Sequence, residues 1–257
     1  TTLKGFGKAA GIPAATWASG GALNTGRNRP MSSASGHTAA LGFSGSDNPP
    51  TSYSVATEKY DGTSWTEVNE MSTGRSGGVG TGNSQDAALA TGGYSGSYNN
   101  EVEQWNGTSW TEVAEINTAR GEIPGGGGTS TSSIIAGGYA PPGKLNNAET
   151  WDGTSWTEVS ELNLARNGLA GAGASSTNAM VYAGDVHPTS PRFANATEVW
   201  NGSSWTEVND LNTGRLDLGG GGFSSSQAIA FGGATTPNSE NETETWNGAS
   251  WTEQSEL

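Results

Sequence analysis

A ten-residue string that recurs five times constrains this chain more than any other feature of its sequence. The string reads Glu-x-(Tyr or Trp)-(Asn or Asp)-Gly-(Thr, Ser or Ala)-Ser-Trp-Thr-Glu. Its later tryptophan stands at Trp65, Trp110, Trp156, Trp205 and Trp251, at spacings of 45, 46, 49 and 46 residues. A fixed period of this length is typical of repeat architectures, in which each unit is one supersecondary element.

Two further positions keep a constant distance from these tryptophans. An arginine follows ten residues after each of the first four, another stands ten residues after Trp17, and a glycine follows each arginine by 18 residues. The arginines are Arg27, Arg75, Arg120, Arg166 and Arg215. We therefore expect five units, at approximately residues 27–70, 75–115, 120–161, 166–210 and 215–257.

Each unit has the pattern of four short strands. A glycine-rich segment, a polar turn and a small apolar run precede a hairpin around Asn-Gly or Asp-Gly, the strongest short-range hairpin signal. No segment has a sustained apolar stripe of period 3.6, so helix is not expected. Four strands per unit at this period predict an all-β, five-bladed β-propeller with four antiparallel strands in each blade.

The residues at the fixed positions resemble those of kelch repeats, which also form the central domain of galactose oxidase. The shared features are Gly-Gly after the second strand, an aromatic residue in the third, a tryptophan five residues on, and an arginine before the next first strand. The resemblance covers about residues 17–257 and implies a kelch-type propeller. The departures are local: Ser44 and Ala183 replace the first glycine in two units, and Tyr60 replaces a tryptophan.

Six candidate fourth strands are present for five blades, because Trp17 aligns with the fourth-strand position as well. We expect Trp251 to close blade 5, with residues 1–20 forming a lead-in segment and residues 21–257 forming the propeller. The alternative is that Trp17 supplies a closing strand and displaces residues 251–257.

The composition fits a folded chain that has few hydrophobic residues and many glycines. Hydrophobic residues make up only 32% of the sequence and 41 of the 257 residues are glycine. Glycine on the innermost strands would let them crowd around a narrow axis, and tryptophans near the rim would supply the missing apolar burial.

The charge and the residue types exclude several function classes. A net charge of −14 disfavours nucleic acid and anionic membrane surfaces as partners, and no apolar run is long enough for membrane insertion. With no cysteine and only His37 and His187, which should lie on opposite faces, we expect no metal and no cofactor. The lack of cysteine also excludes galactose oxidase activity, since the resemblance implies a cysteine–tyrosine cross-link and copper for that reaction.

Acidic residues recur at three positions of every unit. Pairs of them could act as glycosidase carboxylates or calcium ligands, but a catalytic pair is needed only once. We therefore interpret all fifteen as solvated charge on the outer rim. They are Glu58, Glu103, Glu149, Glu198 and Glu244; Glu67, Glu112, Glu158, Glu207 and Glu253; and Glu70, Glu115, Glu161, Asp210 and Glu256.

The recurring arginines allow two interpretations. They could form a ring of guanidinium groups for an anionic ligand, or they could bind loop carbonyls and a glutamate of the neighbouring blade. Identical use in every unit favours the structural interpretation.

All variation in length falls between the second and third strands of the units. These loops should share one face with the connections that carry the arginines, and loops on a rigid scaffold are where binding residues concentrate. The alternative is that they are surface loops without a function. The candidate ligand-binding residues are Tyr53, Tyr94, Tyr98, Tyr139, Asp185, His187, Arg192 and Phe193.

The Asn-Thr-Gly-Arg and Asn-Thr-Ala-Arg strings are similar to kelch-type repeats encoded by marine cyanobacterial viruses and their hosts. This resemblance implies a non-enzymatic virion-surface, fibre or decoration protein, located on the virion surface or outside the cell. It would bind a host glycan or another virion or surface protein, in a multimeric assembly. The alternative is a glycoside hydrolase or lyase that uses Asp185, His187 and Arg192, but those residues come from one blade only.

Overall fold

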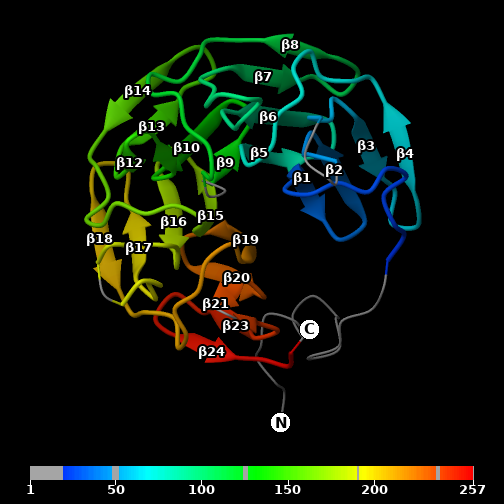
Figure 1. Ribbon diagram of the computed structural model, residues 1–257. Helices are drawn as coiled ribbons and strands as arrows, with labels where there is room; N and C mark the ends of the chain where they lie inside the picture. Colours follow the sequence, from blue (N-terminus) through cyan, green and yellow to red (C-terminus); the bar gives the residue numbers. More distant parts are fainter. Residues whose placement is uncertain (1–19, 48–51, 124–126, 190, 236–237, 257) are drawn as a thin grey trace.

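The computed structural model describes residues 20–47, 52–123, 127–189, 191–235 and 238–256. All regular structure in these ranges is β-strand, and no helix occurs in them. The strands form five four-stranded antiparallel sheets arranged around a central axis (Figure 1). The expectation of an all-β, five-bladed β-propeller is confirmed.

Each blade runs from an inner first strand to an outer fourth strand. Blade 1 contains β1 (Met31–Gly36), β2 (Ala39–Phe43), β3 (Thr57–Tyr60) and β4 (Trp65–Val68). Blade 2 contains β5 (Val79–Ser84), β6 (Ala87–Thr91), β7 (Val102–Trp105) and β8 (Trp110–Glu112). Blade 3 contains β9 (Gly128–Thr129), β10 (Ser132–Ala136), β13 (Ala148–Trp151) and β14 (Trp156–Val159). Blade 4 contains β15 (Ala170–Ser175), β16 (Asn178–Tyr182), β17 (Thr197–Trp200) and β18 (Trp205–Val208). Blade 5 contains β19 (Gly219–Ser224), β20 (Gln227–Phe231), β23 (Thr243–Trp246) and β24 (Trp251–Glu253).

Two of the variable loops carry small hairpins of their own. In blade 3, β11 (Tyr139–Ala140) pairs with β12 (Gly143–Lys144), and in blade 5, β21 (Ala234–Thr235) pairs with β22 (Asn238–Ser239). The length variation between the second and third strands is therefore ordered structure in these two blades.

The turn between the third and fourth strands explains the Asn/Asp-Gly-x-Ser string. In blade 1, Asp61 Oδ1 accepts hydrogen bonds from the backbone N–H groups of Thr63 at 2.8 Å and Ser64 at 2.9 Å. Gly62 has a φ of +96°, which glycine adopts without strain. The acid or amide at this position therefore caps the turn through its own side chain, and the glycine lets the chain reverse.

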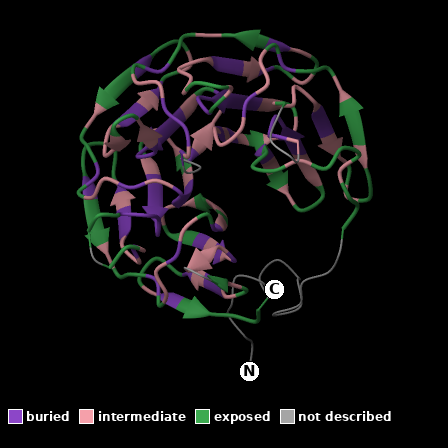
Figure 2. Cartoon of the chain, in the orientation of Figure 1, coloured by how far each residue is buried: buried purple, intermediate pink, exposed green. Residues whose placement is uncertain are grey.

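Tryptophan pairs provide much of the burial in the outer half of the blades. The turn pairs Trp105 with Trp110 across the strands β7 and β8, with ring centroids 5.4 Å apart, and blades 3 to 5 repeat this arrangement. Each pair packs against the preceding blade, as when Trp105 and Trp110 pack against Leu41 and Phe43. Figure 2 shows that burial is concentrated in the second and third strands of each sheet, while the outermost strands carry exposed residues. Few but large apolar side chains thus build the interfaces between blades.

Inner-strand glycines allow neighbouring blades to approach closely, as the sequence predicts. A Cβ atom on Gly80 of β5 would lie 2.2 Å from the backbone oxygen of Ser32 in β1. A Cβ atom on Gly173 of β15 would lie 2.7 Å from Cα of Gly127. A side chain at either position would push two first strands apart.

A buried arginine–glutamate pair lies inside every blade. The nitrogen–oxygen distances are 2.9 Å for Arg27–Glu58 and Arg75–Glu103, and 2.8 Å for Arg166–Glu198 and Arg215–Glu244; Arg120 also pairs with Glu149. All ten side chains are at most 1% exposed. The arginines also donate to backbone carbonyls, as Arg166 does to Ala183 at 3.1 Å and Ala196 at 2.7 Å. The structural interpretation of the arginines is therefore the one that the contacts support.

The rim interpretation of the acids is wrong for one of the three sets. Glu58, Glu103, Glu149, Glu198 and Glu244 are buried counterions of the arginines, whereas the other ten acids are exposed. The second carboxylate oxygen of each buried glutamate accepts a backbone N–H three residues before the arginine, as Glu198 does from Asn163 at 2.8 Å. Because both oxygens have donors, the carboxylate fixes the connection that enters each blade.

The five blades follow one another along an arc, and blades 1 and 5 are its ends (Figure 1). The inner strands β1, β5, β9, β15 and β19 each contact the next in this series. Within the described residues, β19 makes no comparable contact with β1, and no buried cluster joins blade 5 to blade 1. Trp251 lies in β24, the fourth strand of blade 5, and Trp17 lies outside the described residues.

Candidate functional site

The variable loops and the arginine-bearing connections lie on one face of the propeller, which we call the loop face. Isolated bridges join the two kinds of segment in each blade, such as Ser76 with Tyr94 and Gly121 with Tyr139. In addition, the second glycine of four blades donates its N–H to the arginine carbonyl of the next blade, as Gly93 does to Arg120 at 2.8 Å. The rigid frame of the blades therefore positions the loops.

Four of the predicted binding residues form a continuous row of aromatic rings on this face. The ring centroids of Tyr53 and Tyr94 are 6.0 Å apart, those of Tyr94 and Tyr98 are 5.2 Å apart, and those of Tyr98 and Tyr139 are 5.4 Å apart. The four side chains come from blades 1, 2 and 3. We call them the tyrosine row.

Two members of the tyrosine row line a concavity of about 510 Å³. Its lining includes Tyr94, Tyr98, Ala140 and Pro141. Tyr94 is 38% exposed, and the other three tyrosines are half-buried. Burial, assisted by the negative charge of Glu122, raises the pKa of the Tyr98 phenol. The phenol therefore stays protonated at neutral pH and can donate a hydrogen bond.

The other four predicted residues form a separate cluster in blade 4. Arg192 Nη2 lies 3.1 Å and Lys144 Nζ lies 3.7 Å from carboxylate oxygens of Asp185. The guanidinium of Arg192 stacks on the ring of Phe193, with its central carbon 5.2 Å from the ring centroid. His187 contributes its backbone N–H, which donates to Asp185 Oδ1 at 2.7 Å, and its carbonyl, which accepts from Lys144 at 2.8 Å.

These contacts determine the chemistry available to Asp185. Burial works to raise the pKa of its carboxyl, but the His187 N–H, Arg192 and Lys144 together hold that pKa below the usual value. A carboxylate stabilised in this way is a weak base and a poor proton donor. The cluster anchors the loop of blade 4.

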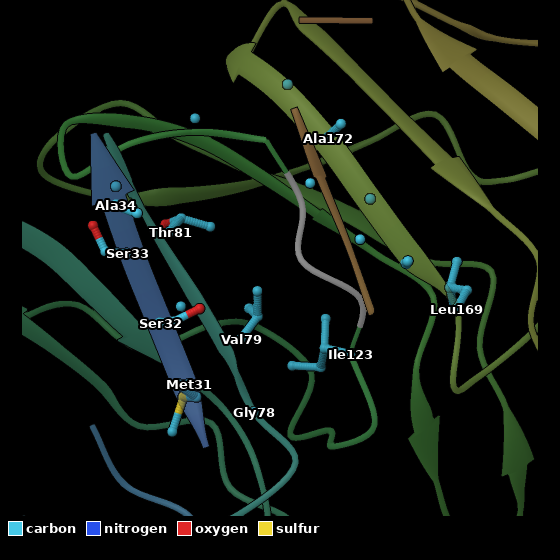
Figure 3. A pocket seen from close by; sticks show the side chains of 18 of the residues that line it. Met31, Ser32, Ser33, Ala34, Gly78, Val79, Thr81, Ile123, Leu169 and Ala172 are labelled. Atoms are coloured by element: carbon cyan, nitrogen blue, oxygen red, sulfur yellow. The ribbon is translucent and has the colours of Figure 1, made fainter. Parts of the chain in front are cut away.

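The central channel is a second cavity, of about 610 Å³, lined by the first strands of the blades. Figure 3 shows short side chains such as Ser32, Ala34 and Ala172 around it, together with the larger Met31, Ile123 and Leu169. At its loop-face end, Arg29 lies 3.5 Å from a carboxylate oxygen of Glu122 and 3.2 Å from one of Asp217. Burial raises the pKa of Asp217, with Arg29 opposing and Glu122 adding to the effect.

These three residues were not predicted from the sequence. Arg29, Glu122 and Asp217 have positive φ values of 48°, 50° and 52°, and each stands two residues after the recurring arginine. Glycine occupies the same position in the other two blades, at Gly77 and Gly168. The glycines were the signal for a left-handed position, and a charged residue there projects from a constrained backbone.

Neither histidine belongs to a group that resembles a metal site. His37 lies in the turn between β1 and β2, and His187 lies in the loop between β16 and β17. No group of three or more His, Asp or Glu side chains suitable for a metal ion occurs in the described ranges. In the same ranges, no helix is long and apolar enough to cross a membrane.

These features define a five-bladed, all-β propeller with an aromatic row on its loop face. No protein-family model and no curated protein matches this chain.

Proposed function

We propose that this chain is a non-enzymatic recognition module, a kelch-type propeller that binds carbohydrate through the tyrosine row. The row itself is the observation that supports this function. Tyrosine offers a flat apolar face for the C–H groups of a sugar ring and a phenol for its hydroxyl groups. Rings from three blades are held by a rigid frame, with centroids 5.2–6.0 Å apart and planes inclined by 49–74° to one another, so ring edges, faces and phenol groups lie together on one surface.

The charge of the chain narrows the class of ligand. With a net charge of −14, the surface repels polyanions and favours neutral or amino sugars. Glu122, whose charge acts on Tyr98, adds a negative charge beside the tyrosine row.

The setting we propose is a virion-surface, fibre or decoration protein, located on a virion or outside the cell. It rests on the resemblance of the repeats to those of marine cyanobacterial viruses and their hosts. Other virion or surface proteins are then partners, and a multimeric assembly would multiply weak contacts to a glycan.

A glycoside hydrolase or lyase is the competing function, and the blade 4 cluster weighs against it. Such an enzyme needs one carboxylic acid with a raised pKa close to a second carboxylate. Asp185 has the opposite bias because of Arg192 and Lys144.

A glycan array probed with the purified chain tests the proposal. We expect binding to neutral or amino sugars, reduced at least tenfold by Tyr94→Ala or Tyr139→Ala. The matched control is Phe223→Ala, which removes an exposed aromatic residue of β19 outside the tyrosine row. An array without binding would contradict the carbohydrate ligand, and polysaccharide turnover abolished by Asp185→Asn would contradict the non-enzymatic role.

A further inference from the structure

In blades 1 to 4, one surface of the sheet is covered by the blade that follows. The corresponding surface of blade 5 is not covered in this way by any described residue. The second-strand residues Leu41, Leu89, Ile134 and Met180 face the following blade and are all 0% exposed. The equivalent residue of blade 5, Ile229 in β20, is only half-buried. We call this surface, defined by Ile229 and Thr243, the forward face of blade 5.

A missing backbone contact marks the same face. The second glycine of blades 1 to 4 donates to the arginine carbonyl of the next blade at 2.8–2.9 Å. Gly233 stands at this position in blade 5, and its N–H makes no equivalent bond within the described residues. The backbone N–H of Gly233 is therefore a donor for which the described residues supply no acceptor.

Third-strand threonines show what a following blade supplies. Trp110 Nε1 donates to Thr57 Oγ1 of the preceding blade at 2.9 Å, and Trp251 Nε1 donates to Thr197 Oγ1 at 3.0 Å. Thr243 occupies the same position in blade 5 and is 3% exposed, yet its Oγ1 has no hydrogen-bond partner in the described part of the chain. A buried hydroxyl without a partner is costly, so Thr243 indicates a place for a tryptophan N–H.

At the other end of the arc, residues 20–27 make the contacts of a connection that arrives from a preceding blade. The backbone and side chain of Asn24 donate to Glu58 Oε2 at 2.8 and 2.9 Å, as Asn117 does to Glu149. Leu23 lies against Gly42 and stands four residues before Arg27, the spacing of Leu162 and Arg166. By the same register, a fourth-strand tryptophan belongs ten residues before Arg27, where the sequence has Trp17.

We propose that the forward face of blade 5 binds the segment around Trp17 of the same chain, with the indole N–H of Trp17 donating to Thr243 Oγ1. In the described blades, a fourth-strand tryptophan packs against the preceding blade, and the residue six positions later packs against the following one. Leu23 is six positions after Trp17 and contacts blade 1, so the same register would give blade 5 as the contact of Trp17. The segment joins the two ends of the arc while Trp251 keeps its place in β24.

A double-mutant cycle in the full chain tests this contact. Trp17→Phe removes the indole N–H but keeps a ring, and Thr243→Val removes the hydroxyl at constant volume. We expect each to lower the Tm by about 2–4 °C, and the double variant to melt no lower than the single ones. Thr197→Val is the matched control, because the decrease in Tm that it causes should add fully to the decrease caused by Trp17→Phe.

A change in Tm of the opposite sign for Thr243→Val would overturn the proposal. If no donor reaches Thr243, then removing its unpaired buried hydroxyl leaves the Tm unchanged or raises it. A loss from Thr243→Val that is the same with Phe at position 17 would also overturn it. A Tm that rises with protein concentration, together with a dimer in light scattering, would assign the face to a second copy instead.

A second measurement is made on the unmodified chain, and Trp17→Phe serves only to assign the resonance. The indole ¹H–¹⁵N resonance that disappears in Trp17→Phe belongs to Trp17. We expect that resonance to be protected from solvent exchange in the unmodified chain. Exchange at the rate of a free indole would contradict the proposal.

Discussion

Arg166 and Glu198 form a charge pair 2.8 Å apart inside blade 4, and neither side chain is more than 1% exposed. Burial lowers the pKa of the Arg166 guanidinium, while the charge of Glu198 opposes that shift. The pair joins the connection that enters the blade to the third strand of the same blade, and all five blades repeat it. The repeat thus places a recurring polar group in each blade interior.

Removing one member of this pair should be severely destabilising. We expect Glu198→Ala to lower the free energy of unfolding by about 3–5 kcal/mol, because it leaves a buried guanidinium uncompensated. Arg166→Met combined with Glu198→Leu should recover part of the loss, since it leaves no unpaired charge but removes the partners of the Ala183 and Ala196 carbonyls and of the Asn163 N–H. Urea unfolding of the native chain, Glu198→Ala and the double variant measures this, and a double variant no more stable than Glu198→Ala would contradict it.

Glycine at the inner-strand contact should not tolerate a methyl group. We expect Gly80→Ala to cost about 1–3 kcal/mol or more, because its Cβ would lie 2.2 Å from the Ser32 backbone oxygen. Gly221→Ala is the matched control, since a Cβ there has no atom within 4 Å. Thermal unfolding should separate the two variants, and equal Tm values would show that the strands move apart freely.

The indole N–H groups of the fourth-strand tryptophans should contribute differently to the free energy of unfolding. Trp251 donates to Thr197 at 3.0 Å, whereas the buried Nε1 of Trp156 has no partner among the described residues. We expect Trp251→Phe to cost about 1 kcal/mol more than Trp156→Phe, because only the first loses a hydrogen bond. The two indoles are similarly buried, at 6% and 7% exposed, and Trp251 also lies 4.8 Å from the ring of Tyr182; denaturant unfolding of both variants measures the difference. A larger loss for Trp156→Phe would refute the difference.

The turn of blade 3 should respond to acid. Hydrogen bonds from the Thr154 hydroxyl and from the Ser155 and Thr154 N–H groups lower the pKa of Asp152 to about 2. An unfolded aspartate titrates near about 3.9, so the contribution of this carboxylate to stability is complete above that pH and is lost as the pH falls toward 2.

Asp152→Asn is the natural comparison, because Asn106, Asn201 and Asn247 cap the same turn in three other blades. We expect the difference in Tm between the native chain and this variant to shift in favour of the variant as the pH falls from 4 to 2. A difference that does not change with pH would contradict the assignment.

Spacing along the chain was enough to predict the blades. The tryptophans, arginines and Asn/Asp-Gly turns act within single units, through period-two strands and a hairpin turn that is set locally. The glycines of the inner strands were also interpretable, because a ring of sheets leaves little space at its axis. The loop candidates Tyr53, Tyr94, Tyr98 and Tyr139 could be named as members of variable loops, but not as one row.

The paired glutamates show why the remainder could not be predicted. Glu103 and Glu112 occupy opposite positions on neighbouring strands, yet the first is buried against Arg75 and the second is exposed. Nothing in their local sequence separates them, because both follow the same repeat. Only the path of the connection between blades places the guanidinium beside one of the two.

The sequence by itself determined the number of blades, the four strands of each and the face on which the variable loops lie, because those depend on short-range periodicity. The tertiary structure decided which acids are buried, which tyrosines meet, that Asp185 is neutralised by Arg192 and Lys144, and that the described blades form an arc with distinct ends. These depend on contacts between segments tens of residues apart, whose distances are set by how whole sheets pack against one another.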